Sequence, residues 1–186
     1  FLVLAPSGSN VPDPRGSYPA DFYDKPFGRV LARTGWDSNC TWMGFKCSWN
    51  SINHQLGDGL QLEFFRKGEG LTKEKTTYTN GNEYLSPDYH NALGIQNSLI
   101  TGGTTPSFFS GEWDQHAWVR GGQWVLALNN GDPSTRASFD PGYVYCYGDA
   151  TNLYNRPSEW QPLTQNIMDI LHASRSLFWL KPDLMV

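Results

Sequence analysis

The most regular pattern of hydrophobic positions lies between Asp37 and Gly57. Large apolar side chains recur there at the three- and four-residue intervals of one helix face: Trp42, Phe45, Trp49, Ile52 and Leu56. Asp37 and Ser38 suit the N-cap of such a helix, and Gly57 suits its end. The pattern therefore predicts a helix over residues 39–56, with Cys40 in its first turn.

Other segments have the composition and alternation of β-strands. They are residues 27–32, 60–68, 75–86 and 142–148. The apolar runs at 116–119 and 124–128 flank a Gly121-Gly122 turn, which indicates a hairpin.

Two further helices are predicted later in the chain. A short one runs from about Pro87 to Leu93, because proline suits a first helical position. The other follows a capping box formed by Ser158 and Gln161. Its buried stripe consists of Trp160, Leu163, Ile167 and Ile170.

This order of elements predicts an α+β fold of two packed layers. We expect a single domain over residues 1–175, followed by an extended apolar tail at 176–186. A chain of 186 residues is long enough for one domain with a substantial core. Because it begins at Phe1, we expect that a signal or initiator segment was removed or that a longer precursor was cut.

Composition excludes several classes of function. The net charge of −4 and the scattered lysines and arginines are not typical of nucleic-acid binding, and no apolar stretch is long enough to span a membrane. The chain has no CxxC or HExxH motif, so we expect no metal and no cofactor. Three cysteines are too few for a disulfide scaffold, which favours a reducing, cytoplasmic compartment, with secretion as the alternative.

The predicted elements bring a thiol and an imidazole into a catalytic pattern. The N-terminal dipole of the predicted helix would lower the pKa of Cys40 and activate it as a nucleophile. In the predicted hairpin His116 faces Ala127, and Asn129 is its diagonal neighbour, close enough to orient the imidazole. Cys47 stays open as an alternative nucleophile.

This Cys, His, Asn order resembles the papain-like cysteine peptidases, and in particular the picornaviral leader proteases of the foot-and-mouth-disease type. The similar segments are "DSNCTW", "EWDQHAWV", "GGQWVLALNN" and "DPGYVYCYGD…SEWQ". Two features depart from that family. Asn129, Asn130 or Asp132 would replace its aspartate, and no glutamine or asparagine stands five or six residues before Cys40 to complete an oxyanion hole.

The resemblance implies a papain-like fold and a cysteine endopeptidase with Cys40, His116 and Asn129 as catalytic residues. It implies a polypeptide substrate, namely the chain's own C-terminus and host proteins in the host cytoplasm, and a monomer or a weak dimer through the C-terminal tail. Trp113 and Trp118 are candidates for the substrate cleft. Two alternatives remain open: a cell-wall peptide amidase, and a secreted or capsid-type β-rich module that binds carbohydrate or protein through its aromatic residues.

Overall fold

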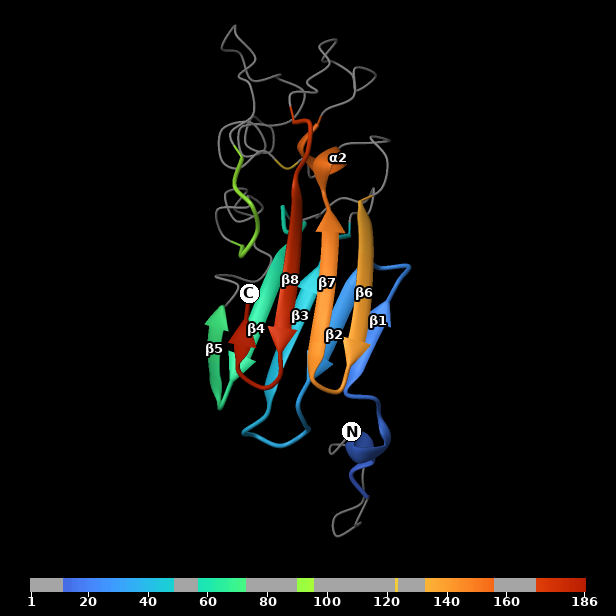
Figure 1. Cartoon of the computed structure of the whole chain (residues 1–186), viewed down its shortest axis with the longest axis vertical. Helices are drawn as coiled ribbons and strands as arrows, with labels where there is room; N and C mark the ends of the chain where they lie inside the picture. Colours follow the sequence, from blue (N-terminus) through green and yellow to red (C-terminus); the bar gives the residue numbers. More distant parts are fainter. Residues whose placement is uncertain (1–11, 49–56, 73–89, 96–122, 124–132, 156–169) are drawn as a thin grey trace, which may run out of the picture.

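The described part of the chain folds as two antiparallel β-sheets that pack face to face (Figure 1). The structure is a computed structural model that describes residues 12–48, 57–72, 90–95, 123, 133–155 and 170–186. Besides the strands it contains two four-residue helical turns, η1 (Pro14–Ser17) and α2 (Thr151–Tyr154).

The first sheet is a five-stranded meander. Its strands follow one another in chain order: β1 (Asp21–Asp24), β2 (Arg29–Arg33), β3 (Thr41–Lys46), β4 (Gln61–Arg66) and β5 (Glu69–Thr72). Each pairs antiparallel with the next, and an irregularity in register lies between Phe64 and Phe65 where β4 meets β5.

The second sheet has four strands, also in chain order. They are β6 (Ser134–Asp140), β7 (Tyr143–Asp149), β8 (Ser174–Leu180) and β9 (Leu184–Met185). In Figure 1 this sheet lies in front of the first one, with its strands running in roughly the same direction. The arrangement is a β-sandwich, in which each sheet has one inner face and one outer face.

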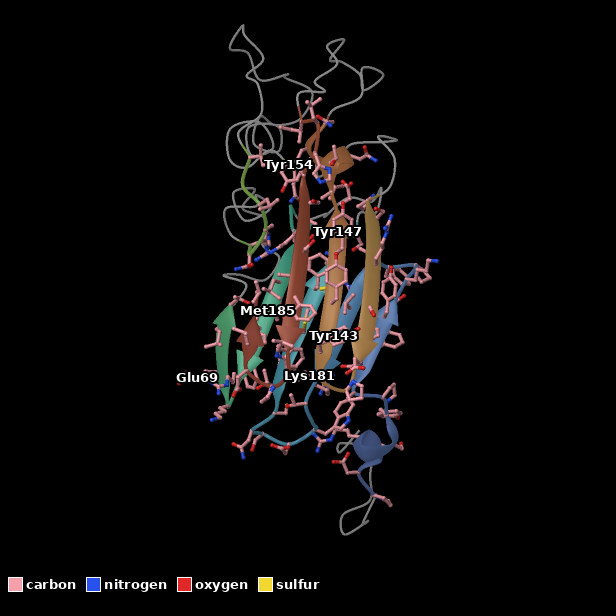
Figure 2. All side chains as sticks on the ribbon, viewed as in Figure 1. Glu69, Tyr143, Tyr147, Tyr154, Lys181 and Met185 are labelled. Carbon is pink, nitrogen blue, oxygen red and sulfur yellow. The ribbon has the colours of Figure 1, made fainter. Side chains whose placement is uncertain are left out.

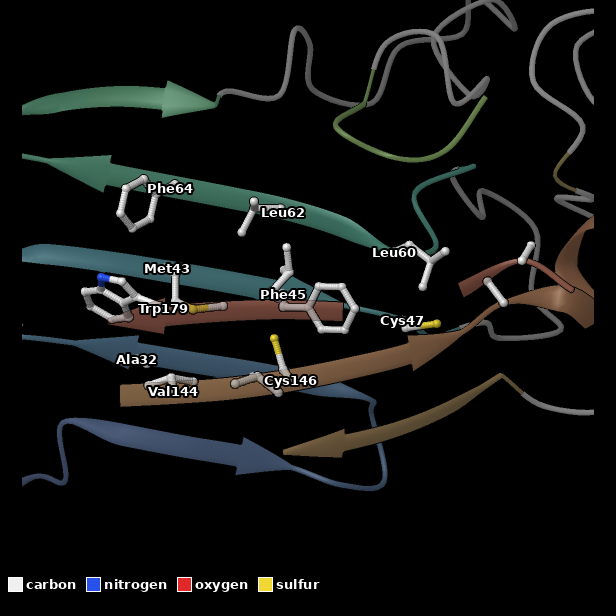
Figure 3. Close-up of a cluster of buried hydrophobic side chains, with 14 of the residues drawn as sticks. Ala32, Met43, Phe45, Cys47, Leu60, Leu62, Phe64, Val144, Cys146 and Trp179 are labelled. Atoms are coloured by element: carbon white, nitrogen blue, oxygen red, sulfur yellow. The ribbon is translucent and has the colours of Figure 1, made fainter. Parts of the chain in front are cut away.

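The core fills the space between the sheets (Figure 3). Alternate residues of each strand point inward, and the largest fully buried side chains are Trp179, Tyr154, Phe45, Met43, Leu60, Val30, Val144, Cys47 and Cys146. The Trp179 ring meets Phe64 of the opposite sheet edge-on, with 5.8 Å between the centroids.

Polar contacts at the margins also join the two sheets. The Lys181 ammonium lies 2.7–2.8 Å from both carboxylate oxygens of Asp21, and both side chains are largely buried. The Tyr23 hydroxyl donates to the carbonyl of Thr135 at 2.7 Å. These contacts connect β1 to β6 and to the turn after β8, so the sheets form one unit.

The predicted α+β, papain-like fold is wrong, because the described residues form two antiparallel sheets and almost no helix. In place of the N-terminal part of the predicted helix 39–56, residues Thr41–Lys46 form β3. Asp37 accepts a hydrogen bond from the N–H of Asn39, so it closes a turn before a strand instead of capping a helix. The chosen stripe combined Trp42, on the outer face of β3, with Phe45, on its inner face.

Residues 176–186, which we expected to be an extended tail, form most of β8 and all of β9, and Trp179 is completely buried. The strands predicted at 27–32, 60–68 and 142–148 correspond to β2, β4 and β7. The strand predicted at 75–86, the 116–128 hairpin and the helix after Ser158 lie wholly or mainly outside the described residues.

Candidate ligand-binding groove

The predicted catalytic residues are only partly within the described structure. His116, Asn129, Trp113 and Trp118 lie outside the described residues, as do the alternatives Asn130 and Asp132. Cys40 is described and lies just before β3, only 8% exposed, with its N–H donating to the carbonyl of Asp37. Because no helix begins there, the helix dipole that would have activated this thiol is absent at Cys40.

Cys40 and Cys47 lie before and after the same strand, about 23 Å apart at the rise of a β-strand. Burial raises the pKa of the Cys47 thiol to about 12 and that of the Cys146 thiol to about 12. Both therefore stay protonated near neutral pH. In the described structure they act as small apolar core residues, since the thiolate is the nucleophilic form.

This burial predicts slow thiol chemistry in the folded protein. A pKa near 12 instead of 9 lowers the thiolate fraction of Cys47 and Cys146 about a thousandfold at neutral pH. Iodoacetamide at pH 6 to 8 should therefore label these two thiols at least a hundredfold more slowly than in the urea-unfolded chain, as followed by mass spectrometry. The contrary result is rapid labelling of one cysteine at pH 6 that is lost in His116→Ala, since that would indicate a thiol peptidase.

One described cluster has the residue types of a serine nucleophile site. The Ser174 hydroxyl lies 2.8 Å from Nε2 of His172, and Nδ1 of the same ring lies 3.8 Å from Asp149. That second distance is too long for a hydrogen bond, so no carboxylate among the described residues fixes the imidazole in one tautomer. Asp149 instead accepts hydrogen bonds from the backbone N–H and the hydroxyl of Thr151. Burial acts to raise its pKa, but hydrogen bonds from Thr151 outweigh burial and lower the pKa. The His172 side chain is exposed, so its hydrogen bond with Ser174 is a surface contact and not a catalytic pair.

A groove crosses the outer face of the first sheet, over β2, β3 and β4. Its volume is about 390 Å³, and it is lined by Arg29, Leu31, Gly44, Phe45, Lys46, Asp58, Gln61 and Glu63. The strand register explains its shape. Leu31, Gly44 and Glu63 stand side by side across the three strands, so the missing side chain of Gly44 leaves a gap between two neighbours.

Nothing in the backbone or the packing requires a glycine at position 44. Its φ is not positive, unlike those of Gly28 and Gly68. A Cβ built there would lie 3.6 Å from Leu31, 3.9 Å from Trp42 and 4.0 Å from Glu63, which are ordinary van der Waals distances. The glycine is thus compatible with a larger residue, and its effect is to keep the groove open.

An apolar wall bounds the groove at the Trp42 end. The indole of Trp42 stacks on Phe65 of β4 with 5.5 Å between centroids and 18° between planes. The six-membered ring of Trp42 lies beside Gly44, 3.9 Å from where its Cβ would stand. Leu31 provides a second apolar surface across the gap.

The other end of the groove is polar and has no net charge. Arg29, Lys46 and Gln61 form the next row across the strands. Lys46 is ion-paired with Asp58, and the Gln61 amide nitrogen donates to Glu63 at 3.1 Å. Two cationic side chains are thus balanced by two carboxylates.

One polar atom at this end has no partner among the described residues. Gln61 is only 6% exposed, and its Oε1 accepts no hydrogen bond. An unsatisfied buried acceptor costs about 1–3 kcal/mol. This oxygen is itself buried, so a ligand hydroxyl in the groove would reach it only if the Gln61 side chain rotated.

Neither metal binding nor membrane insertion is indicated by the part of the chain that is described. It contains no group of three histidine, cysteine or acidic side chains that could hold a metal ion. It also contains no helix of the length and hydrophobicity that crossing a bilayer requires.

Comparisons with known proteins add no identification: no family model matches this sequence, and no curated protein matches it. The class of protein is therefore defined by the fold and the groove alone, as an antiparallel β-sandwich with an open groove on its outer surface.

Proposed function

We propose that this chain is a non-catalytic binding module that holds a neutral saccharide in the groove over Gly44. The observation that carries the proposal is an open groove whose lining has no net charge and includes an apolar surface at Leu31. A charged ligand gains no net attraction from such a lining. Sugar hydroxyls suit it because each can both donate and accept a hydrogen bond.

The two ends of the groove match the two kinds of surface on a sugar ring. Hydroxyls can donate to Glu63 and accept from Arg29, while the C–H groups lie against Leu31 and the edge of Trp42. Because the groove is open, we expect weak binding, with a dissociation constant in the micromolar to millimolar range.

The peptidase implied by the family resemblance is less well supported by the described residues. Its nucleophile was to stand at a helix N-terminus, and Cys40 precedes a strand instead. The proposed module requires no reactive thiol and matches the β-rich binding module that the aromatic content also indicates.

The proposal is tested by isothermal titration of the protein with four neutral hexasaccharides: cello-, malto-, manno- and N-acetylchitohexaose. We expect at least one to bind, and the Gly44→Val variant to bind it at least tenfold more weakly because the valine fills the gap. Gly44→Val should keep its fold, since valine favours strands and the site has room for it.

A 3′-sialyllactose arm and a chitosan hexamer arm test the charge argument, and neither should bind more tightly than the best neutral sugar. As a matched control, Ser138→Val on the outer face of the second sheet should leave saccharide binding unchanged. Failure of all four neutral sugars to bind, or equal binding by Gly44→Val, contradicts the proposed function.

A further inference from the structure

The outer face of the second sheet carries a patch that the groove does not involve. This aromatic face consists of Tyr143, Tyr145, Tyr147, Phe178, Leu180 and Leu184. The first five alternate with inward-pointing residues along β7 and β8, and Leu184 of β9 pairs with Leu180. Figure 2 shows Tyr143 and Tyr147 on β7, in the sheet nearer the viewer. Phe178, Leu180 and Leu184 are 37%, 42% and 54% exposed, respectively. Such a concentration of exposed apolar side chains marks an interaction surface.

The ring geometry within this face favours a protein partner. Tyr143 and Phe178 stack on each other with 5.4 Å between centroids and 28° between planes. Each ring therefore has one flat side covered by the other, so the pair forms an ordered ridge instead of a flat platform for a sugar ring. Ordered aromatic side chains with a polar margin are typical of protein interfaces.

Charges beside the aromatic face are arranged so that the surface complements itself. Arg136 and Asp140 both point outward from β6, two residues on either side of Ser138. Ser138 stands in one row with Tyr145 and Phe178 across the sheet. A twofold axis along that row would place a second copy with Arg136 opposite its Asp140, and the converse contact would form as well.

We propose that two copies of this chain associate face to face through the aromatic face, with Tyr145 and Phe178 near the twofold axis and two Arg136–Asp140 pairs at the margin. Three strands of seven residues would span about 14 by 23 Å, and with the two residues of β9 the face covers roughly 350 Å², which is less than half of the about 800 Å² per partner of a standard interface. The dimer is accordingly weak. It leaves both Gly44 grooves on its outside, and it does not depend on what those grooves bind.

Sedimentation velocity of the purified chain between about 1 µM and 1 mM tests this association. A concentration-dependent shift from monomer to dimer is expected, and Phe178→Thr should weaken dimerisation at least tenfold. Phe22→Thr makes the same change at an exposed position of β1 on the other sheet and should have no effect. Circular dichroism of each variant verifies folding.

The charge pairs are tested by introducing one substitution into two backgrounds. A purely structural effect would change dimerisation in the same direction in both, whereas a charge effect changes sign. Arg136→Asp should weaken the dimer about tenfold, because two carboxylates would then face each other. Asp140→Asn keeps the side-chain oxygen that accepts from the Gly142 N–H, so the β6–β7 turn is preserved. It should weaken dimerisation of the wild-type chain yet strengthen dimerisation of Arg136→Asp. A monomer at every concentration, an unaffected Phe178→Thr variant, or Asp140→Asn weakening both backgrounds equally would overturn the proposal.

Discussion

Replacing Trp179 by alanine is expected to lower the free energy of unfolding by about 3–5 kcal/mol, as large-to-small changes of buried aromatic residues do. Trp179 is completely buried in β8 and packs edge-on against Phe64 of the opposite sheet. Its indole N–H also donates to the carbonyl of Pro182 at 3.2 Å, which closes the turn before β9. The truncation therefore leaves a large cavity between the sheets and removes a turn contact.

Urea denaturation followed by circular dichroism, at protein concentrations low enough to keep the chain monomeric, measures this loss. Leu180→Ala is the matched control, because Leu180 is the next residue of β8 but lies on the outer face, 42% exposed. It should cost no more than about 1 kcal/mol. Equal effects of the two substitutions would indicate that residues 176–186 are not packed as a strand of the sandwich.

Gly148→Val is expected to destabilise the protein by at least about 3 kcal/mol or to prevent folding. Gly148 lies on the inner face of β7, where a Cβ would come within 2.8 Å of Cys47, Leu60 and Phe45 at once. Three core side chains from the opposite sheet would all have to move, which means that the sheets must separate locally. Overpacking of this kind commonly costs about 1–3 kcal/mol even for single added groups.

Gly44→Val makes the same chemical change on the outer face of β3, where a Cβ has ordinary contacts. Its free energy of unfolding should equal that of the wild type within about 0.5 kcal/mol or exceed it slightly, because valine favours strands over glycine. Thermal unfolding of both variants in one series provides the comparison. A Gly44→Val variant as unstable as Gly148→Val would show that the inner and outer faces are assigned incorrectly.

The sequence predicted those strands whose side chains alternate between an apolar and a polar environment. Residues 142–148 are the clearest example, with Val144 and Cys146 inward and tyrosines outward. Residues 41–46 were misassigned because both faces of β3 carry large apolar side chains, so a three- and four-residue spacing could be found among them. Because the adjacent residues Trp42 and Met43 are both large and apolar, the sequence of this strand shows no clear alternation of apolar and polar residues.

The groove could not be predicted from the sequence, because it depends on strand register. Only the pairing of β2, β3 and β4 places Gly44 between Leu31 and Glu63. Along the chain Gly44 resembles any glycine in an apolar run, where it suggests only a bulge or a close backbone approach. Among the functions predicted from the sequence, the aromatic binding module is the one closest to a saccharide-binding module.

The position of the bound sugar on the protein decides whether the Gly44 groove is the binding site. We would titrate the ¹⁵N-labelled protein with the tightest-binding neutral hexasaccharide and map the shifted amide signals. We expect the largest shifts at Leu31, Gly44 and Glu63, with the signals of Ser138 and Tyr145 unchanged. Shifts concentrated on the second sheet or around His116, or no shifts at all, would contradict it.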